Sequence, residues 1–272
     1  MVKRDQTLLA HERRLRPRKR LGQHFLVDAA LRDRVIAAAG IGPDDEVLEI
    51  GAGPGTLTRD LTRQARRVVA IEVDRRLLPR LRSAAPAAEI VIDDVLKVDL
   101  AVLFPQGGEI VVGNIPYYLT GALVPHLLGS EPRPRRLSLV VQREVAERWC
   151  GRDGWSLATV AVQTFSEPRI EFELPPQAFE PPPRVTSALV VLDVRPRPAV
   201  EVADLNRFFR FVEAVFQFRR KQLRATLARI TERPADEVES GLTKLEIDPE
   251  RRAETLSLSE WEATFRLFGG LS

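Results

Sequence analysis

The segment LEIGAGPGTLT (residues 48–58) decides the fold expected for this chain, because it joins an apolar run to a helical pattern through three closely spaced glycines. Gly51, Gly53 and Gly55 allow the backbone to approach a ligand closely, and the first turn of the following helix offers unpaired N–H groups. The spacing is not that of the phosphate-binding G-x-x-x-x-G-K-[ST] loop. The segment therefore predicts a strand, a ligand-binding turn and a helix, and it leaves the ligand open.

Short apolar runs alternate with helical patterns from about residue 45 to residue 145. The runs predict buried strands at 46–50, 67–73, 89–92, 109–114 and 137–142, and the patterns predict helices at 56–65 and 75–85. Strands that alternate with helices form right-handed crossovers and a parallel sheet. Two further runs, 168–176 and 187–196, have no long helix between them and predict an antiparallel pair that closes the sheet edge. The expected fold class is α/β with a Rossmann-like sheet.

The pattern changes near residue 200. Helical periodicity covers 205–218 and 219–230, and 257–268 begins with a Ser/Glu helix-start signal. The phenylalanines between residues 208 and 218 are most simply the core of a small helical unit. We expect a basic and partly disordered N-terminal arm at 1–20, a ligand-binding sheet domain at 21–200 and an all-helical domain at 201–272.

The composition favours a soluble, cytoplasmic protein. A single cysteine excludes an intrachain disulfide and indicates a reducing compartment. No apolar run approaches the roughly 20 residues that span a bilayer, and the N-terminus lacks the apolar region of a secretory signal. The formal net charge is only +3, but arginines cluster at 13–20, 133–136 and 218–224. Such clusters suit a polyanion, although each cluster alone could be a solvated face. The residues expected to contact nucleic-acid phosphates are Arg219, Arg220, Lys221 and Arg224.

Acidic residues follow the second and third predicted strands. Glu72 ends the second strand about 20 residues after the glycine loop, where a carboxylate can accept hydrogen bonds from both ribose hydroxyls of a nucleoside ligand. NAD and S-adenosylmethionine both fit this pattern, and Glu49, just before the loop, favours the methyl donor. The third strand ends in IDDVLK (92–97), where Asp94 could accept the amino group of an adenine. The alternative for Asp93 and Asp94 is a plain helix cap.

The fourth strand ends in GNIPYY (113–118), which holds more functional groups than a turn needs. The Asn114 amide oxygen can accept a hydrogen from an exocyclic amine, and the proline can hold the Ile115 carbonyl toward the same crevice. Two acceptors on one amino group favour its pyramidal, nucleophilic form. Tyr117 offers a flat ring for a base. The combination suits methyl transfer to an aromatic amino group, and the alternative is a strand-end turn with two packing tyrosines.

The tetrapeptide Asn-Ile-Pro-Tyr at 114–117 resembles the [DNS]-P-P-[YF]-type signature of amino methyltransferases. With LGQHFLVD (21–28) before it and AFEPPPRVTSALV (178–190) after it, the chain resembles the ribosomal RNA adenine N6,N6-dimethyltransferases from about residue 18 to its end, and most closely their small-subunit members. The resemblance implies S-adenosylmethionine as donor. It also implies a monomer that dimethylates two adjacent adenosines near the 3′ end of 16S rRNA in the assembling 30S subunit.

Matching the motifs position by position implies roles for individual residues. The donor site would contain His24, Leu26, Gly51, Glu72, Asp94 and Asn114. Tyr117 and Phe179 would stack on opposite faces of the target base, as enzymes hold a base taken out of its stack. His24 stands where the family usually has asparagine, and an imidazole can also donate a hydrogen bond. The connection at 150–155 is shorter than the family usually has, which affects the RNA-facing rim.

The remaining alternatives differ in substrate or in class. The related large-subunit adenine methyltransferases of macrolide resistance share the donor site and the aromatic residues, so those residues do not separate the two. A catalytically idle RNA-binding factor on the same fold conflicts with the intact Glu72, Asp94, Asn114 and Tyr117. An NAD-dependent oxidoreductase leaves Asn114, Tyr117 and the arginine clusters unexplained. The three histidines and one cysteine lack metal-ligand spacing, so we expect no metal and no covalent intermediate.

Overall fold

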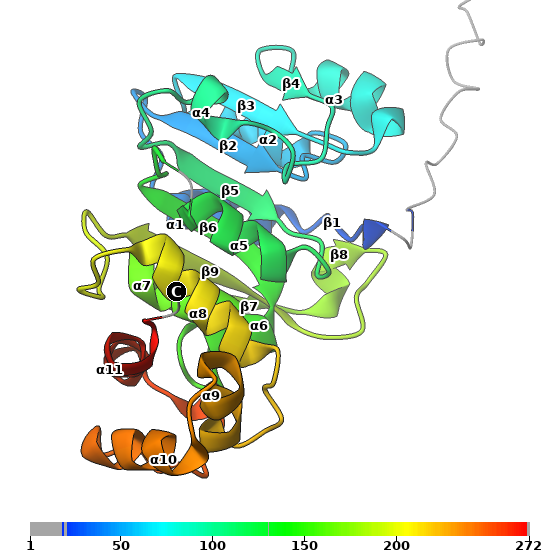
Figure 1. The fold of residues 1–272 in the computed structure, drawn as a ribbon. Coiled ribbons are helices and arrows are strands. Elements are labelled where there is room, and N and C mark those ends of the chain that lie inside the picture. The colour runs from blue at the N-terminus through cyan, green and yellow to red at the C-terminus, as the bar shows by residue number, and fades with distance from the viewer. Residues whose placement is uncertain (1–17, 19–20, 130, 271–272) are drawn as a thin grey trace, which may run out of the picture.

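The computed structural model describes residues 18, 21–129 and 131–270. Its main feature is a seven-stranded sheet with the order β4-β3-β2-β5-β6-β9-β7 (Figure 1). The strands are β2 (Glu46–Ile50), β3 (Arg67–Ile71), β4 (Glu89–Val91), β5 (Ile110–Asn114), β6 (Arg136–Gln142), β7 (Ser166–Leu174) and β9 (Ser187–Val194). The first five of these are parallel, and β9 pairs antiparallel with both β6 and β7. The expected α/β sheet and its antiparallel edge pair are therefore confirmed. Of the N-terminal arm expected at 1–20, the structure describes only Arg18, so the expected disorder of the arm lies outside the described residues.

The helices that surround the sheet are α1 (Ala29–Ala39), α2 (Thr56–Leu61), α3 (Leu78–Ala84), α4 (Leu100–Leu103), α5 (Thr120–Gly129), α6 (Arg143–Trp149) and α7 (Leu157–Phe165). Local signals explain the ends of α1. The Asp28 side chain accepts a hydrogen bond from the Leu31 N–H, and Gly40 ends the helix at a φ of 64°. A separate two-stranded sheet joins β1 (Phe25–Leu26) to β8 (Phe179–Glu180).

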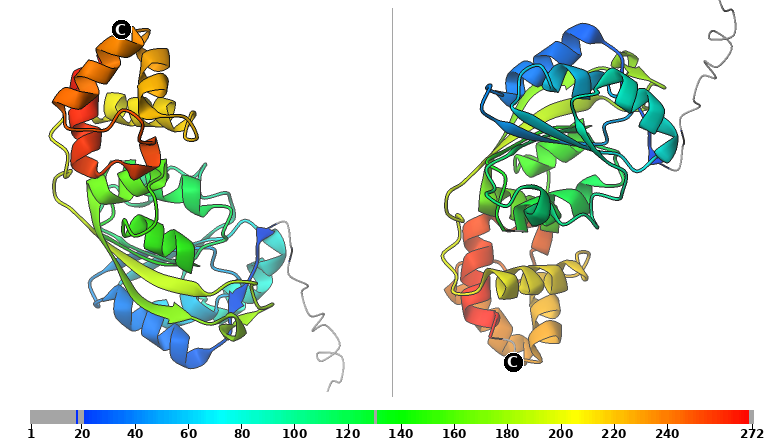
Figure 2. Two further views of the ribbon diagram at one scale, coloured as in Figure 1. Left: turned by 90° about the horizontal axis from the view of Figure 1, so that it is seen from below. Right: turned by 90° about the horizontal axis from the view of Figure 1, so that it is seen from above.

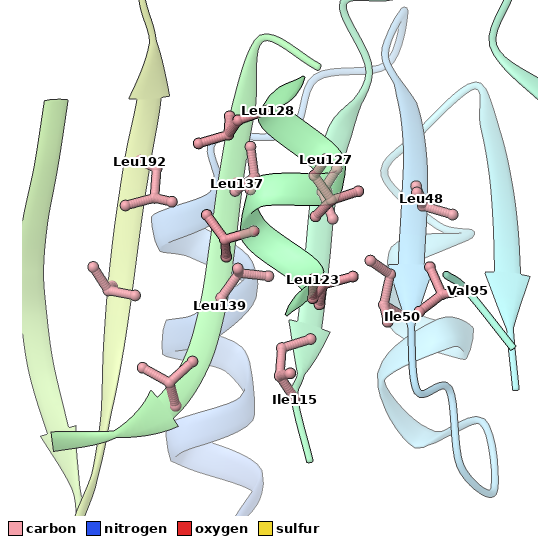
Figure 3. Packing of buried hydrophobic residues seen from close by; sticks show 14 of the residues in the cluster. Leu48, Ile50, Val95, Ile115, Leu123, Leu127, Leu128, Leu137, Leu139 and Leu192 are labelled. Carbon is pink, nitrogen blue, oxygen red and sulfur yellow. The ribbon is translucent and has the colours of Figure 1, made fainter. Parts of the chain in front are cut away.

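Both faces are buried along β2, β3, β5, β6 and β9, as the continuous apolar runs predict, whereas the edge strands β4 and β7 are partly exposed. Leu48 and Ile50 of β2 pack with α5 and α7 on one face, whereas Val47 packs with α1 and α2 on the other. Figure 3 shows α5 lying across the first of these clusters, with Leu123 and Leu127 directed at the strands. The period of two along each strand assigns alternate side chains to the two faces. This packing holds the carboxyl ends of the strands at one edge of the sheet.

The C-terminal part consists of α8 (Leu205–Phe216), α9 (Leu223–Thr231), α10 (Ala235–Lys244) and α11 (Leu258–Phe268), which lie together at one end of the molecule (Figure 2). Phe208 and Phe211 are buried in their shared core together with Trp261, and Phe216 packs against it, which confirms the expected role for these phenylalanines, whereas Phe218 lies outside the core beneath the Arg229 guanidinium. Phe209 packs against this core and against the sheet cluster, so it joins the two. The helix-start signal is confirmed, since Ser257 and Glu260 form a reciprocal capping box at α11.

One helix prediction begins too early. The segment expected to be helical at 219–230 starts as a turn, because α8 ends at Phe216 and Gln222 has an extended backbone with a ψ of 147°. Arg219, Arg220 and Lys221 lie in this turn, where they are exposed. Only Arg224 lies on a helix, in the first turn of α9. The predicted strand at 67–73 is also too long, since β3 ends at Ile71 and Glu72 turns toward the glycine loop.

Candidate active site

The carboxyl ends of β4, β3, β2 and β5 are neighbours in the sheet, and a cavity of about 250 Å³ lies beside them. Five of the residues proposed for the donor site line this one cavity: His24, Gly51, Glu72, Asp94 and Asn114. They come from five separate stretches of the chain. The strand order, which places the ends of β3 and β5 on either side of β2, is what brings them together. This location is where ligands of open α/β sheets bind.

The glycine loop lies between the two cavities: Gly51 lines the large cavity, and Gly51 and Gly53 line a smaller one beside it. Gly51 and Gly53 have φ values of 74° and 60°, which side chains rarely adopt. A Cβ added to Gly53 would lie 3.1 Å from the Phe25 ring, so the loop also needs glycine for its close approach to β1. The Gly51 N–H donates to the Ile71 carbonyl, and the Gly53 N–H donates to Glu72 Oε2 at 2.8 Å. The loop is therefore tied to the end of β3.

Glu72 is held in one orientation by backbone donors. Its Oε2 accepts from the Gly53 N–H and its Oε1 accepts from the Asp74 N–H, both at 2.8 Å. The residue is only 5% exposed, and burial raises the pKa of its carboxyl above the usual value. Each carboxylate oxygen has a second lone pair. Glu72 lines the cavity, and a carboxylate with lone pairs to spare at this place fits a pair of ribose hydroxyls.

Glu49 provides a second buried carboxyl beside the glycine loop. It lines a smaller cavity of about 30 Å³ that shares Phe25, Gly51 and Asn114 with the larger one. Its Oε2 has no hydrogen-bond partner among the described residues. Burial, together with the neighbouring Glu72 carboxylate, raises the pKa of Glu49 to about 8. Glu49 is therefore mostly protonated at neutral pH. An unpartnered oxygen in a small cavity also leaves room for a donor group from a ligand or a water.

Asp93 and Asp94 line the cavity from the turn after β4. Asp94 Oδ1 accepts from the Leu96 N–H at 3.1 Å, and Asp93 Oδ1 accepts from the Asp94 N–H at 2.7 Å. These bonds stabilise a turn and cap no helix, because α4 has its own N-cap at Asp99. The helix-cap alternative is therefore wrong. Asp94 Oδ2 stays available for the adenine role.

Asn114, at the end of β5, has a fixed amide orientation. Its Nδ2 donates to the His24 carbonyl at 2.5 Å. Because a carbonyl can only accept, the amide nitrogen must face His24. The Oδ1 atom is then the part of the side chain that remains to accept a hydrogen from an amine in the cavity. The orientation of the Ile115 carbonyl stays a prediction.

The two tyrosines have different surroundings. The Tyr117 hydroxyl is hydrogen bonded to Ser187 Oγ at 2.8 Å, and its ring stacks on the His24 ring with the centroids 5.8 Å apart. His24 Nδ1 donates to the Pro181 carbonyl at 2.7 Å, so it links the residue before β1 to the run of three prolines at 181–183. Tyr118 lines the cavity directly and is 62% exposed. The sequence pattern predicts a role only for Tyr117.

Leu26 and Phe179 lie outside the large cavity. They are register partners in the pairing of β1 with β8, and both are buried, at 9% and 3% exposure. Leu26 lines the small cavity beside Glu49, and Phe179 packs into the core below the sheet. The stacking of Phe179 on a base therefore stays a prediction, and it requires the ring to leave this packing.

Sequence reasoning gave no role to Gln23, which lines the large cavity, or to the buried Asp74 that it contacts.

Two structural absences concern only the part of the chain described. Over residues 18, 21–129 and 131–270, no group of three or more His, Cys, Asp or Glu side chains could hold a metal ion. Across the same residues, no helix is long and apolar enough to cross a membrane.

The glycine loop, the acids after consecutive strands and the Asn-Ile-Pro-Tyr turn together define an α/β methyltransferase with an adenosine-containing donor. Residues 14–268 match the family model described as ribosomal RNA adenine dimethylase, and the chain belongs to this family. Its members use S-adenosylmethionine, and the residues present fit that donor: a glycine loop without side chains, a buried acid on the ribose side and an orphaned carboxyl oxygen beside the loop.

Several proteins are similar over most of the chain. A protein named ribosomal RNA small subunit methyltransferase A, from Pelotomaculum thermopropionicum, is 43% identical and covers 90% of this chain and 89% of its own. A protein of the same name from Magnetococcus marinus is 40% identical, with coverage of 93% and 92%. The crystal structure of the 23S rRNA methyltransferase ErmE is 31% identical, with a TM-score of 0.69 and coverage of 90% and 99%. A dimethyladenosine transferase from Plasmodium falciparum, 24% identical with a TM-score of 0.72, covers 90% of this chain and 98% of its own and shows the same fold.

Proposed function

We propose that this protein transfers methyl groups from S-adenosylmethionine to N6 of two adjacent adenosines near the 3′ end of 16S rRNA in the assembling 30S subunit. The product is N6,N6-dimethyladenosine at both positions. The observation that carries the chemistry is the fixed amide of Asn114, whose Oδ1 is left as an acceptor in the cavity that Gly51, Glu72 and Asp94 also line. The names of the relatives at 37–43% identity favour the small-subunit substrate. We also propose that the protein acts as a monomer in the cytoplasm.

The donor supplies a methyl group made electrophilic by the sulfonium to which it is attached. The N6 lone pair of adenine is delocalised into the ring, so the enzyme must favour the pyramidal form of that nitrogen. Asn114 Oδ1 accepts one N6 hydrogen, and the Ile115 carbonyl takes the other in our proposal. The new N–C bond forms as the carbon–sulfur bond breaks. The nitrogen becomes acidic on methylation and loses its proton without a strong base.

The target base is held by stacking in this proposal. The Tyr117 ring is positioned from two sides, by Ser187 at its hydroxyl and by the His24 ring at its face. Burial raises the pKa of the Tyr117 phenol, so it stays neutral at physiological pH. Phe179 would provide the opposite face once the RNA has displaced it from its packing.

A specific observation keeps the large-subunit alternative open: ErmE is 31% identical over 90% of this chain. The test is a transfer assay with radiolabelled S-adenosylmethionine on under-methylated small subunits and on naked large-subunit rRNA, followed by mapping of the label. We expect label at adjacent adenosines near the 3′ end of 16S rRNA, and its loss in Tyr117→Ala. Label confined to large-subunit rRNA would contradict the proposed substrate and keep the chemistry.

The exposed turn between α8 and α9 is the proposed phosphate contact. Arg219, Arg220 and Lys221 are exposed there, whereas Arg224 is paired with Glu239 at 2.7 Å. Replacing the first three by glutamine should weaken rRNA binding and lower the slope of its salt dependence by up to three. The control variant neutralises Arg59, Arg63 and Arg66, three exposed arginines on and after α2, and should leave binding nearly unchanged. Equal effects of both variants would show a general charge effect and no specific contact.

A further inference from the structure

One wall of the donor cavity is built from the N-terminal segment. Leu21, Gln23, His24 and Phe25 all line the cavity, and they precede the sheet domain in the chain. Backbone pairing holds this segment where β1 meets β8, and the Asn114 side chain holds the His24 carbonyl. Its other end, at Arg18 and Gln23, reaches the sheet through side chains. The shape of the cavity therefore depends on what those side chains contact.

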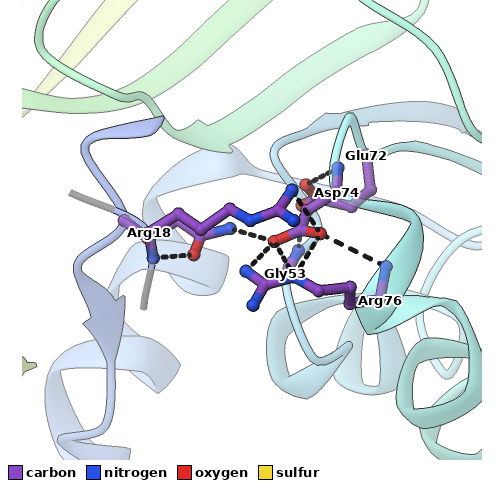
Figure 4. Close-up of polar contacts among 6 residues, drawn as sticks. Arg18, Gly53, Glu72, Asp74 and Arg76 are labelled. Atoms are coloured by element: carbon purple, nitrogen blue, oxygen red, sulfur yellow. Dashed lines mark hydrogen bonds and ion pairs between the residues drawn. The ribbon is translucent and has the colours of Figure 1, made fainter. Parts of the chain in front are cut away.

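They contact Asp74, which follows β3 and is only 1% exposed (Figure 4). Gln23 Nε2 donates to Asp74 Oδ2 at 3.1 Å, and the Arg18 guanidinium lies 3.5 Å from Oδ1. Arg76 binds both carboxylate oxygens, at 2.9 Å and 2.6 Å. The Arg76 guanidinium, followed by the Gln23 amide, lowers the pKa of Asp74 to about 2, against the opposing effect of burial. Asp74 is thus an anion over the whole physiological pH range.

The Gln23 amide cannot turn over in this network. Its Oε1 accepts from the Arg18 N–H at 2.7 Å while its Nε2 donates to Asp74. A flipped amide would set an N–H against an N–H at one end and an oxygen against a carboxylate at the other. The same aspartate donates its own N–H to Glu72, which accepts from the glycine loop. One continuous hydrogen-bonded chain therefore runs from Gly53 through Glu72 and Asp74 to the N-terminal segment.

We infer that Asp74 is a positioning residue that closes the N-terminal segment over the donor site and couples that closure to Glu72. This inference rests on the proposed use of the cavity for S-adenosylmethionine. A bound donor that engages Glu72 stabilises the orientation in which Asp74 accepts from Gln23. The closed segment in turn keeps Phe25 and His24 against the donor. The plain structural alternative is that Asp74 only starts the 3-10 helix at 75–77, where its Oδ1 accepts from the Arg76 N–H.

A reciprocal exchange of side chains separates these readings. Asp74→Asn keeps the size and the capping ability of the residue, but it places an amide against the Gln23 amide. Gln23→Glu sets two carboxylates together. The double variant Gln23→Glu with Asp74→Asn restores one hydrogen bond between the two positions with its polarity reversed and keeps a carboxylate beside Arg18, but it does not restore the contact of Arg76 with both oxygens of residue 74. Asp60→Asn is the matched control, because Asp60 also binds three arginines, but on the outer surface of α1 and α2.

Two measurements are needed, on the full chain. Calorimetry gives the S-adenosylmethionine Kd, and we expect each single variant to weaken binding about tenfold, about 1.4 kcal/mol, and the double variant to bind more tightly than Gln23→Glu. Hydrogen exchange of the peptide 21–28 in the donor-free protein should be faster than in the wild type in both single variants, slower in the double variant than in Gln23→Glu, and normal in Asp60→Asn. Exchange that is unchanged in the single variants, or a double variant that exchanges as fast as Gln23→Glu, would overturn the inference. Absence of donor binding by the wild type would contradict the proposed function instead, and the exchange data would still decide the role of Asp74.

Discussion

Replacement of Glu49 by glutamine should remove a large pH dependence of stability. The unfolded carboxyl titrates near 4.5, whereas burial and Glu72 raise the folded pKa of Glu49 to about 8. A folded pKa above the unfolded one means that the carboxyl stabilises the native state fully only below the unfolded value. That stability is lost as the pH rises through the folded value. At about 1.4 kcal/mol for each pH unit between the two values, the loss amounts to about 5 kcal/mol.

The assay is urea unfolding of the wild type and of Glu49→Gln at intervals from about pH 5 to about pH 9. Glutamine has the same shape as the neutral acid and does not titrate. The free energy of unfolding of the variant minus that of the wild type should therefore rise by about 4 kcal/mol over this interval, most of it below pH 8. Taking the difference cancels the other titrating groups. Glu144→Gln, at an exposed position on α6, should show no such rise. A difference that stays constant with pH would refute a neutral Glu49.

Three other substitutions probe the cavity walls. Tyr118→Ala should weaken donor binding by up to about tenfold, because the ring lines the cavity and an aromatic contact contributes about 1 kcal/mol. Tyr118→Phe should bind the donor like the wild type. If calorimetry finds both variants equally weak, the ring is not the contact. His24→Asn loses the ring that stacks on Tyr117 and keeps a side-chain N–H, so its donor Kd should stay within about threefold of the wild-type value. A donor affinity about a hundredfold weaker, measured by calorimetry, would show that the imidazole itself is needed. Gly53→Ala should lower the melting temperature more than Gly108→Ala. Both glycines have a positive φ, but only a Cβ at position 53 would lie 3.1 Å from another side chain. Equal decreases in melting temperature would assign the whole effect to φ.

The sequence predicts the sheet well because its signals are local and repeated. Each parallel strand is a short run of apolar residues with both faces buried, and that pattern needs no knowledge of the neighbours. The acids after the strands are predictable for the same reason, since the carboxyl ends of parallel strands share one edge. The sequence patterns do not predict α10, and they do not predict the turn at 217–222, because the end of α8 and the start of α9 depend on single backbone conformations such as the extended Gln222.

The cavity wall was less predictable, because it depends on contacts between residues far apart in the chain. Gln23 and Asp74 are separated by 51 positions, and neither carries a local signal for the other. Tyr117 and Tyr118 are adjacent, yet only the backbone turn decides which ring stacks on His24 and which lines the cavity. Phe179 is similar: its motif indicates a base contact, while its register with Leu26 buries the ring. The sequence motifs therefore indicate which residues belong to the site, whereas the packing of distant segments determines what each side chain contacts.

Donor binding should release protons near neutral pH, because the cavity and its small neighbour contain two buried carboxyls with raised pKa values, Glu49 and Glu72. S-adenosylmethionine brings a permanent positive charge at its sulfonium. A cation bound beside these carboxyls favours their ionised forms and lowers their pKa values. By linkage, the donor should bind more tightly as the pH rises from about 6 to about 8. Calorimetry at about pH 8 in two buffers of different ionisation enthalpy should show up to about half a proton released from Glu49, the fraction that is still protonated there. The release should fall in Glu49→Gln, and proton uptake on binding would contradict the neutral carboxyl beside the glycine loop.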